Sequence, residues 1–155
     1  LVTQDAEGIH DYSQVSVELG RRFRALKLWF VIRAYGVGGL QAIIRNHVMW
    51  AGALAKRIGA TPEFELTSPP RLGLFSFRLR PHGSVDGEAL DRLNARFLDA
   101  VNADGTIYLT QTVHDGRYVI RVSIGATATE AKDIDIAYDR IVALAAPILQ
   151  SARKG

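Results

Sequence analysis

The segment from Leu19 to Gly36 constrains the fold of this chain more than any other. A surface helix normally carries one apolar stripe and one polar face, but the large apolar side chains between Leu26 and Ile32 cover most of the circumference. We therefore predict a helix from Arg24 to Tyr35 that is enclosed by protein on nearly all sides. Its cations would then need carboxylate or carbonyl partners, because an unpaired buried charge is very costly.

A second helix is predicted directly after the first. Gly36 would end the first helix in a left-handed cap, and Gly38-Gly39 would form a turn. From Leu40 to Ile58, apolar residues recur at spacings of three and four, which is the pattern of an amphipathic helix. Gly59 is expected to close this helix, because Pro62 prevents its continuation.

The middle of the chain alternates apolar and polar residues in the manner of strands. Two strands are expected, at Glu63 to Thr67 and at Leu72 to Leu79, with a turn at Ser68-Pro69-Pro70 between them. Helical spacing returns from about Asp86 to Asn102. This part therefore predicts two strands followed by a helix.

The last third predicts a hairpin and a final helix. Strands from Ile107 to Val113 and from Tyr118 to Ile124 flank the turn His114-Asp115-Gly116-Arg117, and Asp-Gly is a strong hairpin signal. Thr127 and Glu130 have the spacing of a capping box. The helix that follows carries apolar residues to Ile148, and Pro147 should kink or shorten it.

Together these elements predict an α+β fold. Strands joined by short turns pair antiparallel, and one face of the predicted sheet is apolar. We expect a four-stranded antiparallel sheet with helices on one face, preceded by a buried linking helix.

Composition and charge narrow the function classes. The chain has 155 residues, of which 48% are apolar and 23% charged, as in a single globular domain. The net charge of +3 is spread along the chain, whereas a nucleic-acid site favours a concentrated basic stripe. The longest run of large apolar residues, Leu28 to Ile32, is far short of a membrane span. With no cysteine to suggest disulfides, we expect a cytoplasmic protein that binds neither nucleic acid nor membrane.

The sequence contains no complete catalytic constellation. Neither a Gly-rich phosphate loop nor a Gly-x-Ser-x-Gly motif is present. The histidines lack the spacing of a zinc site, so no metal is expected. His47 is predicted to be a core residue and His114 to be solvated, while Asp133 and Asp135 fit a solvated helix face. Lys27 could act as a nucleophile if its apolar helix lowered its pKa, but an ion-pair or packing role is favoured.

Several short motifs follow one another in step between residues 11 and 48. They are Asp11-Tyr12, Leu19 to Phe30, Arg33 to Val37, Leu40-Gln41, Ile44-Arg45 and His47-Val48. This pattern resembles the pyridoxal-phosphate-dependent group II decarboxylases, and within them the aromatic-L-amino-acid decarboxylases. The likeness continues more loosely to about Ala152. Family members are several times longer, so the resemblance is to their C-terminal part.

The resemblance implies a division of labour within a larger enzyme. Residues 1–36 would be the end of the catalytic-loop region and the buried helix linking to the large domain. Residues 37–155 would be the C-terminal small α+β domain of a fold-type I enzyme. Pyridoxal 5'-phosphate would be bound mainly by the N-terminal part, because the Asn-Pro-His type motif before the family's cofactor lysine is absent here. No catalytic or cofactor-binding residue is therefore expected in this chain.

The resemblance does imply substrate-binding positions. Gly20 would border the substrate side-chain pocket, where glycine leaves room for a large aromatic ring, and Leu19 would line the same wall. The alternative is that Gly20 is only a turn glycine before the helix. Arg21, Arg22 and Arg24 would fasten this segment to the large domain.

The activity implied is decarboxylation of an aromatic L-amino acid, a small-molecule substrate, to an amine and carbon dioxide. The expected partners are an N-terminal large-domain fragment, separated by cleavage in the loop before Leu1, and a second copy in a homodimer. Two alternatives stay open: an aromatic aldehyde synthase of the same family, and a non-catalytic α+β binding module.

Overall fold

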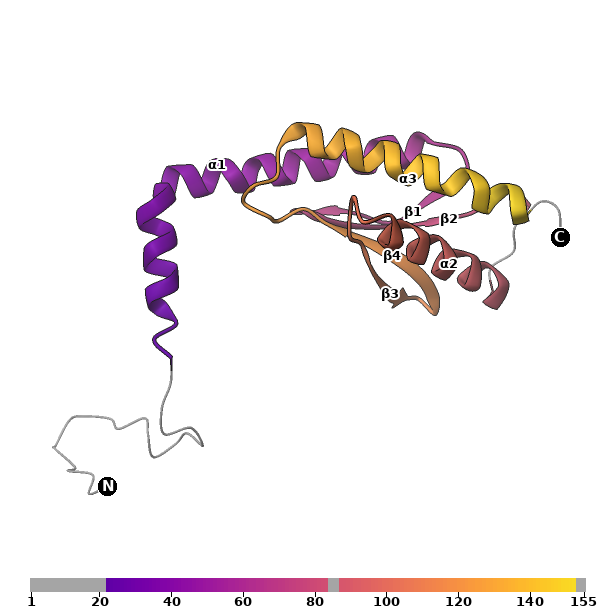
Figure 1. Cartoon of the computed structure of the whole chain (residues 1–155), viewed down its shortest axis with the longest axis horizontal. Coiled ribbons are helices and arrows are strands. Elements are labelled where there is room, and N and C mark those ends of the chain that lie inside the picture. The colour runs from indigo at the N-terminus through magenta and orange to yellow at the C-terminus, as the bar shows by residue number, and fades with distance from the viewer. Residues whose placement is uncertain (1–21, 84–86, 153–155) are drawn as a thin grey trace, which may run out of the picture. The chain divides into compact units, whose positions relative to one another are not determined.

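The computed structural model describes residues 22–83 and 87–152 (Figure 1). The chain divides into two compact units, Leu1–Leu40 and Gln41–Gly155. The elements follow in the order α1, β1, β2, α2, β3, β4, α3. Leu19, Gly20 and Arg21, which were singled out above, lie outside the described residues.

Helix α1 runs from Ala25 to Ala60 with one interruption, at Gly36. The backbone there has φ 68° and ψ 163°, a conformation that is essentially restricted to glycine. The predicted break at Gly36 is confirmed, but the predicted left-handed cap is wrong, because a left-handed residue has a ψ of about +47°. The predicted turn at Gly38-Gly39 is wrong, because one glycine in this conformation suffices to interrupt the helix and both later glycines are helical.

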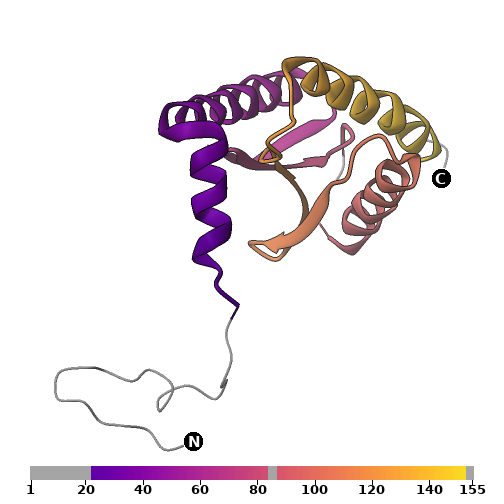
Figure 2. The same ribbon diagram turned by 60° about the vertical axis from the view of Figure 1, so that its left-hand side comes forward.

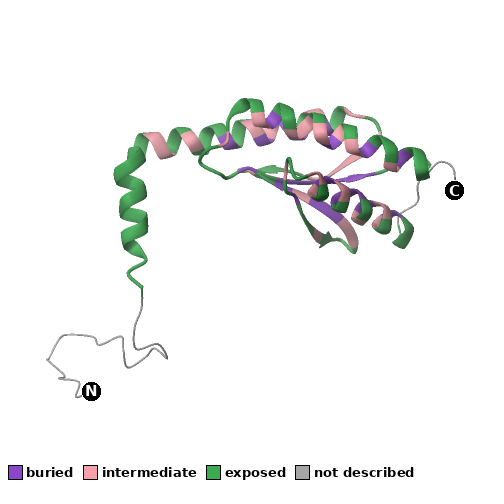
Figure 3. Ribbon diagram, viewed as in Figure 1, coloured by how far each residue is buried: buried purple, intermediate pink, exposed green. Residues whose placement is uncertain are grey.

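The first part of α1 is exposed throughout. Every described residue from Arg22 to Gly38 is exposed (Figure 3). Leu28 is 61% exposed and Trp29 54%. The described residues of this chain therefore do not enclose this helix, and its burial stays a prediction about contacts that lie beyond them.

The second unit contains a four-stranded antiparallel sheet, as predicted. The strands are β1 (Phe64–Arg71), β2 (Leu74–Leu79), β3 (Thr110–His114) and β4 (Arg117–Ser123). Their spatial order is β1-β2-β4-β3, and all three pairings are antiparallel. The hairpin turn is confirmed: Asp115 and Gly116 both have positive φ, at 50° and 73°, as a tight two-residue hairpin turn requires.

Ser68-Pro69-Pro70 lies within β1 and not in a turn, which corrects the prediction. Proline is tolerated in a strand at a sheet edge or a bulge. β1 is an edge strand, and its register shifts on both sides of Ser68. The chain instead reverses at Leu72 and Gly73, where Leu72 has a positive φ of 53°.

Three helical segments form a layer against the sheet (Figure 2). They are the second part of α1, α2 (Glu88–Asp104) and α3 (Ala131–Ala152). Their apolar faces share one core with alternate residues of the strands, including Phe75, Phe77 and Ile120. None of the described helices is both long and apolar enough to cross a membrane.

Helix α3 departs from two predictions. Its first helical residue is Ala131, and the Asp133 carboxylate accepts the Glu130 N–H at 2.8 Å. The cap is therefore formed three residues after the predicted position at Thr127, because Asp133 supplies the acceptor that a helix N-terminus needs. Of the two effects predicted for Pro147, shortening is wrong, because the helix continues to Ala152, and a kink stays a prediction. Burial of Ala145 and Leu149 on either side of Pro147 holds this last turn against the core.

Candidate interaction surface on the first helix

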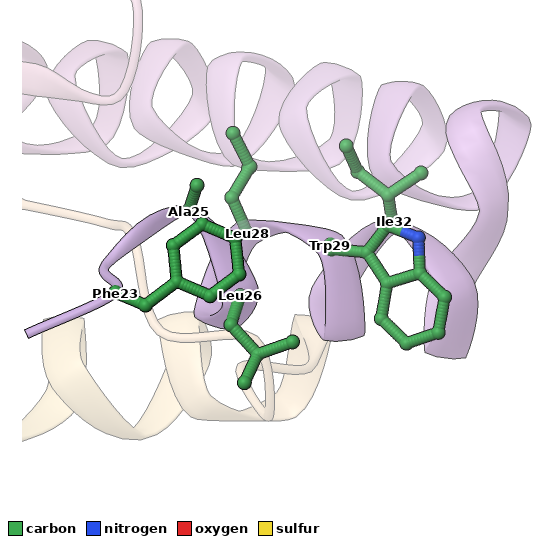
Figure 4. Close-up of a pocket in the computed structure, with 6 residues that line it drawn as sticks. All are labelled: Phe23, Ala25, Leu26, Leu28, Trp29 and Ile32. Carbon is green, nitrogen blue, oxygen red and sulfur yellow. The ribbon is translucent and has the colours of Figure 1, made fainter.

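The first part of α1 carries an open apolar groove of about 510 Å³. Six residues line it: Phe23, Ala25, Leu26, Leu28, Trp29 and Ile32 (Figure 4). Five of them bear side chains larger than alanine and all six are exposed. We refer to these six residues as the apolar groove.

The groove follows from helical spacing. Leu26, Trp29 and Ile32 recur every third residue within α1, which brings their side chains to neighbouring positions along one side of the helix, and Phe23 lies just before the helix begins at Ala25. The apolar run predicted from the sequence extended from Leu26 to Ile32 and did not include Phe23 or Ala25. The spacing of three from Phe23 to Leu26 was the signal that could have found the first of them.

Aromatic contacts hold part of this surface together. The rings of Trp29 and Phe30 meet edge-on with centroids 5.1 Å apart. The Arg33 guanidinium lies 5.7 Å from the centre of the Trp29 ring, within the range of a cation–π contact. The indole face beside the groove is therefore covered by a cation from the next helical turn.

Covering the apolar groove with a packing partner would stabilise the protein considerably. Burying one Leu, Ile or Phe side chain is worth roughly 1.5–3 kcal/mol, and soluble chains seldom leave several such residues exposed side by side. Arg24 and Lys27 flank the groove, and within residues 22–83 and 87–152 no ion pair is formed by either. The surface thus combines apolar area with cations that have not been neutralised by described residues.

The described lysines do not fit a cofactor-binding role. A lysine that forms a Schiff base is commonly desolvated so that its amine loses its proton. Lys27 and Lys56 are exposed, and Lys132 is exposed and lies 2.6 Å from Glu130. No catalytic step through pyridoxal phosphate is therefore assigned to these residues.

The histidines and carboxylates also have structural roles. His47 is 7% exposed, and its ring centre lies 5.9 Å from that of Trp50, as expected for a core residue. His114 is exposed in the hairpin turn, as predicted. Asp135 pairs with Arg57 at 2.6 Å on an exposed helix face. Across the described ranges, His, Asp and Glu nowhere gather as a metal site.

The sequence of this chain is similar to those of known enzymes. The family model for the pyridoxal-dependent decarboxylase conserved domain matches residues 1–80, which is more than half of the chain. This chain belongs to the pyridoxal-dependent decarboxylase family. The resemblance noted between residues 11 and 48 is thereby confirmed at the level of the family.

Two curated members of this family are tryptophan decarboxylase TDC1 of Camptotheca acuminata and tyrosine decarboxylase 4 of Petroselinum crispum. The first is 39% identical over 137 residues, which are 88% of this chain and 27% of the relative. The second is 40% identical over 131 residues, which are 83% of this chain and 26% of the relative. The chain therefore spans about a quarter of the length of these decarboxylases.

Solved decarboxylase-family structures share the fold. Catharanthus roseus tryptophan decarboxylase in complex with L-tryptophan aligns with a TM-score of 0.78 and 32% identity, over 96% of this chain and 31% of that one. Rhodiola rosea 4-hydroxyphenylacetaldehyde synthase aligns with a TM-score of 0.79 and 32% identity, over 91% of this chain and 30% of that one. The α+β architecture is thus that of a segment within these larger chains.

Proposed function

We propose that this chain is the C-terminal portion of a pyridoxal-phosphate-dependent decarboxylase that converts an aromatic L-amino acid to its amine and carbon dioxide. The observation that carries the proposal is the exposed apolar groove on a chain of this family that spans about a quarter of its relatives. An apolar surface of this kind is the expected counterpart of a missing packing partner. The names of the tryptophan and tyrosine decarboxylases support the aromatic substrate class.

In this proposal the two parts of the chain have different roles. Residues 1–36 pack on the large domain through the apolar groove, and residues 37–155 form the small domain. The cofactor is held mainly by the large domain, which agrees with the exposure of the described lysines. The assembled enzyme is a cytoplasmic homodimer.

Gly20 and Leu19 are proposed to form part of the substrate pocket wall. A glycine there leaves space for an indole or phenol ring, so a larger side chain should reduce that space. Gly20→Val should raise the KM for L-tryptophan more than the KM for the smaller L-tyrosine. An equal change for both substrates would favour the turn-glycine alternative.

The proposal is tested with the full-length protein that contains this chain. Purified protein is incubated with L-tryptophan, L-tyrosine and L-dihydroxyphenylalanine, with L-glutamate as the control substrate, and the amine and carbon dioxide are quantified. We expect equal amounts of both products from at least one aromatic substrate and none from glutamate. Absence of both products, together with no visible absorbance from bound pyridoxal phosphate, would favour the binding-module alternative.

A second candidate is an aromatic aldehyde synthase, which the similarity to the Rhodiola rosea enzyme favours. Such an enzyme consumes one dioxygen and one water per amino acid, and releases carbon dioxide, the aldehyde, ammonia and hydrogen peroxide. The same incubation separates the two candidates, because only the synthase consumes oxygen and forms peroxide.

A further inference from the structure

A row of polar residues crosses the sheet on the side turned away from the core. Ser68 of β1 is opposite Ser76 of β2, Ser76 is opposite Arg121 of β4, and Arg121 is opposite Thr110 of β3. Alternation along a strand places these residues on the face opposite to Phe75, Phe77 and Ile120, which are in the core. The register of the strand pairs therefore brings these four residues into one row.

This row borders a pocket of about 280 Å³. Its polar lining residues are Ser68, Ser76, Thr112, His114 and Arg121. Arg121 and Thr112 are partly buried and Ser76 is 7% exposed, so the pocket is recessed into the sheet. We call it the Arg121 pocket.

The Arg121 guanidinium is the strongest hydrogen-bond donor of the Arg121 pocket, and hydroxyl groups lie beside it. The Thr67 hydroxyl donates to the Ser76 Oγ at 2.9 Å, which leaves the Ser76 hydroxyl hydrogen for another acceptor. A guanidinium has five N–H donors in a fork that matches two carboxylate oxygens. The pocket thus offers donors from several strands and one positive charge.

The nearby carboxylates are already engaged by other arginines. The pairs are Arg78 with Asp91 at 3.2 Å, Arg80 with Glu65 at 3.0 Å and Arg117 with Glu65 at 3.3 Å. Within the described part of the chain, no carboxylate lies within ion-pair distance of Arg121. A partly buried guanidinium on this face therefore lacks the counter-charge that its neighbours have.

We propose that the Arg121 pocket receives the carboxylate of an Asp or Glu side chain from the part of the polypeptide outside these 155 residues. The inference rests on the proposed function, because it requires the longer enzyme. The length of the relatives beyond the matched region provides the source, and the charge of Arg121 provides the complementarity. The sheet face is thus a docking surface separate from the apolar groove.

Carbodiimide cross-linking of full-length Arg121→Lys tests this inference. The reagent joins an amine to a carboxylate in direct contact, with loss of one water, and peptide mapping identifies both residues. We expect a link from position 121 to an Asp or Glu outside the 155 residues. A link only to carboxylates of this chain, a link between two copies, or no link at all would overturn the proposal.

Two matched variants make these outcomes decisive. Arg117→Lys should link to Glu65, since the native pair is 3.3 Å apart on the same sheet face. Arg92→Lys should link to Glu88, one helical turn away on the exposed side of α2, and to no residue outside the chain. These two links show that the reagent reacts both on this sheet face and on an exposed helix, so a missing link at position 121 cannot be due to the reagent.

A measurement on the unmutated full-length protein covers the case in which Arg121→Lys does not fold. An arginine-selective dicarbonyl should modify Arg121 at least several-fold more slowly than Arg92, whose side chain is 70% exposed. Equal rates would overturn the proposal. Decarboxylase activity is measured separately, so loss of the proposed function and loss of the docking contact give different results.

Discussion

Asn94 of α2 binds the backbone of Leu79 at the end of β2 through both atoms of its amide. Its Oδ1 accepts the Leu79 N–H at 2.7 Å, and its Nδ2 donates to the Leu79 carbonyl at 3.0 Å. Asn94 is fully buried. The amide therefore takes the place of a neighbouring strand beyond the last pair of β2 with β4, Phe77 with Ile120.

Asn94→Ala should lower the free energy of unfolding by about 1–3 kcal/mol, because two buried backbone groups lose their partners. Urea denaturation of this chain measures the change. Asn102 makes the same pair of bonds with Leu109, at 2.9 and 3.1 Å, but is only partly buried. Asn102→Ala should cost less, since water can replace its amide, and an equal loss in both variants would contradict this account.

Gly73 is predicted to be intolerant of any side chain. Its carbonyl accepts the Ile124 N–H at 2.8 Å, and a Cβ at position 73 would collide with the Ile124 carbonyl oxygen. Gly73→Ala should therefore destabilise the chain by about 1–3 kcal/mol.

Gly52→Ala is the matched control for this prediction. Gly52 is inside α1, and a methyl group added at this position would meet no atom within 4 Å. Alanine there should raise the free energy of unfolding by about 0.5–1 kcal/mol. Thermal unfolding of both variants should show opposite shifts, and a shift of the same sign would refute the steric argument.

The Asp104–Arg140 pair should make stability depend on acid pH. The Arg140 guanidinium hydrogen-bonded to Asp104 holds the pKa of that carboxyl below its usual value, with a smaller contribution from Thr106. Between the lowered pKa and the ordinary carboxyl pKa, the folded chain therefore binds fewer protons than the unfolded chain. The stabilisation is present above the ordinary carboxyl pKa and is lost as the pH falls through the lowered one.

Arg140→Gln and Asp104→Asn should each weaken the dependence of the free energy of unfolding on pH in the acid range. Urea denaturation at a series of pH values from neutral to strongly acid measures the slope. Both variants should give a flatter slope, and Asp104→Asn the flatter of the two, because Arg140→Gln leaves the smaller contribution of Thr106 to the Asp104 pKa in place. A slope that is unchanged in Arg140→Gln would show that another group controls the Asp104 carboxyl.

The apolar groove should make this chain self-associate when it is produced alone. Leu28→Lys with Trp29→Lys replaces two exposed groove residues by charges, so the variant should be monomeric where the unaltered chain is not. Light scattering after size-exclusion chromatography measures the mass. Ile136→Lys changes an apolar residue of α3 that is 44% exposed and should have no effect. A monomeric unaltered chain would contradict the prediction.

Local patterns in the sequence were sufficient for most of the fold. The helix from Leu40, the Asp115-Gly116 turn and the alternating strands are specified by residues close together in the chain, and each was predicted within a few positions. Ser68-Pro69-Pro70 was misassigned because its strand character depends on β1 being at the edge of the sheet. That position is set by distant pairings and cannot be read from the local sequence.

The candidate sites also differ in whether their residues are close together in the sequence. Most of the apolar groove could be located because Leu26, Leu28, Trp29 and Ile32 lie within one helix, although its exposure required the structure. The Arg121 pocket could not be predicted, because Ser68, Ser76 and Arg121 become neighbours only through the register of three strands. Gly20 and Leu19 depend on contacts with residues outside this chain, so their roles stay predictions.

The two edges of the sheet have different capacities to accept another strand. Pro69 and Pro70 remove two N–H donors from β1, and the register shifts around Ser68 interrupt that edge further. At the opposite edge, Thr110–His114 contains no proline. Addition of a foreign strand, whether from a misfolded copy or from a peptide, would consequently start along β3, so any fibre built by this sheet would grow in one direction.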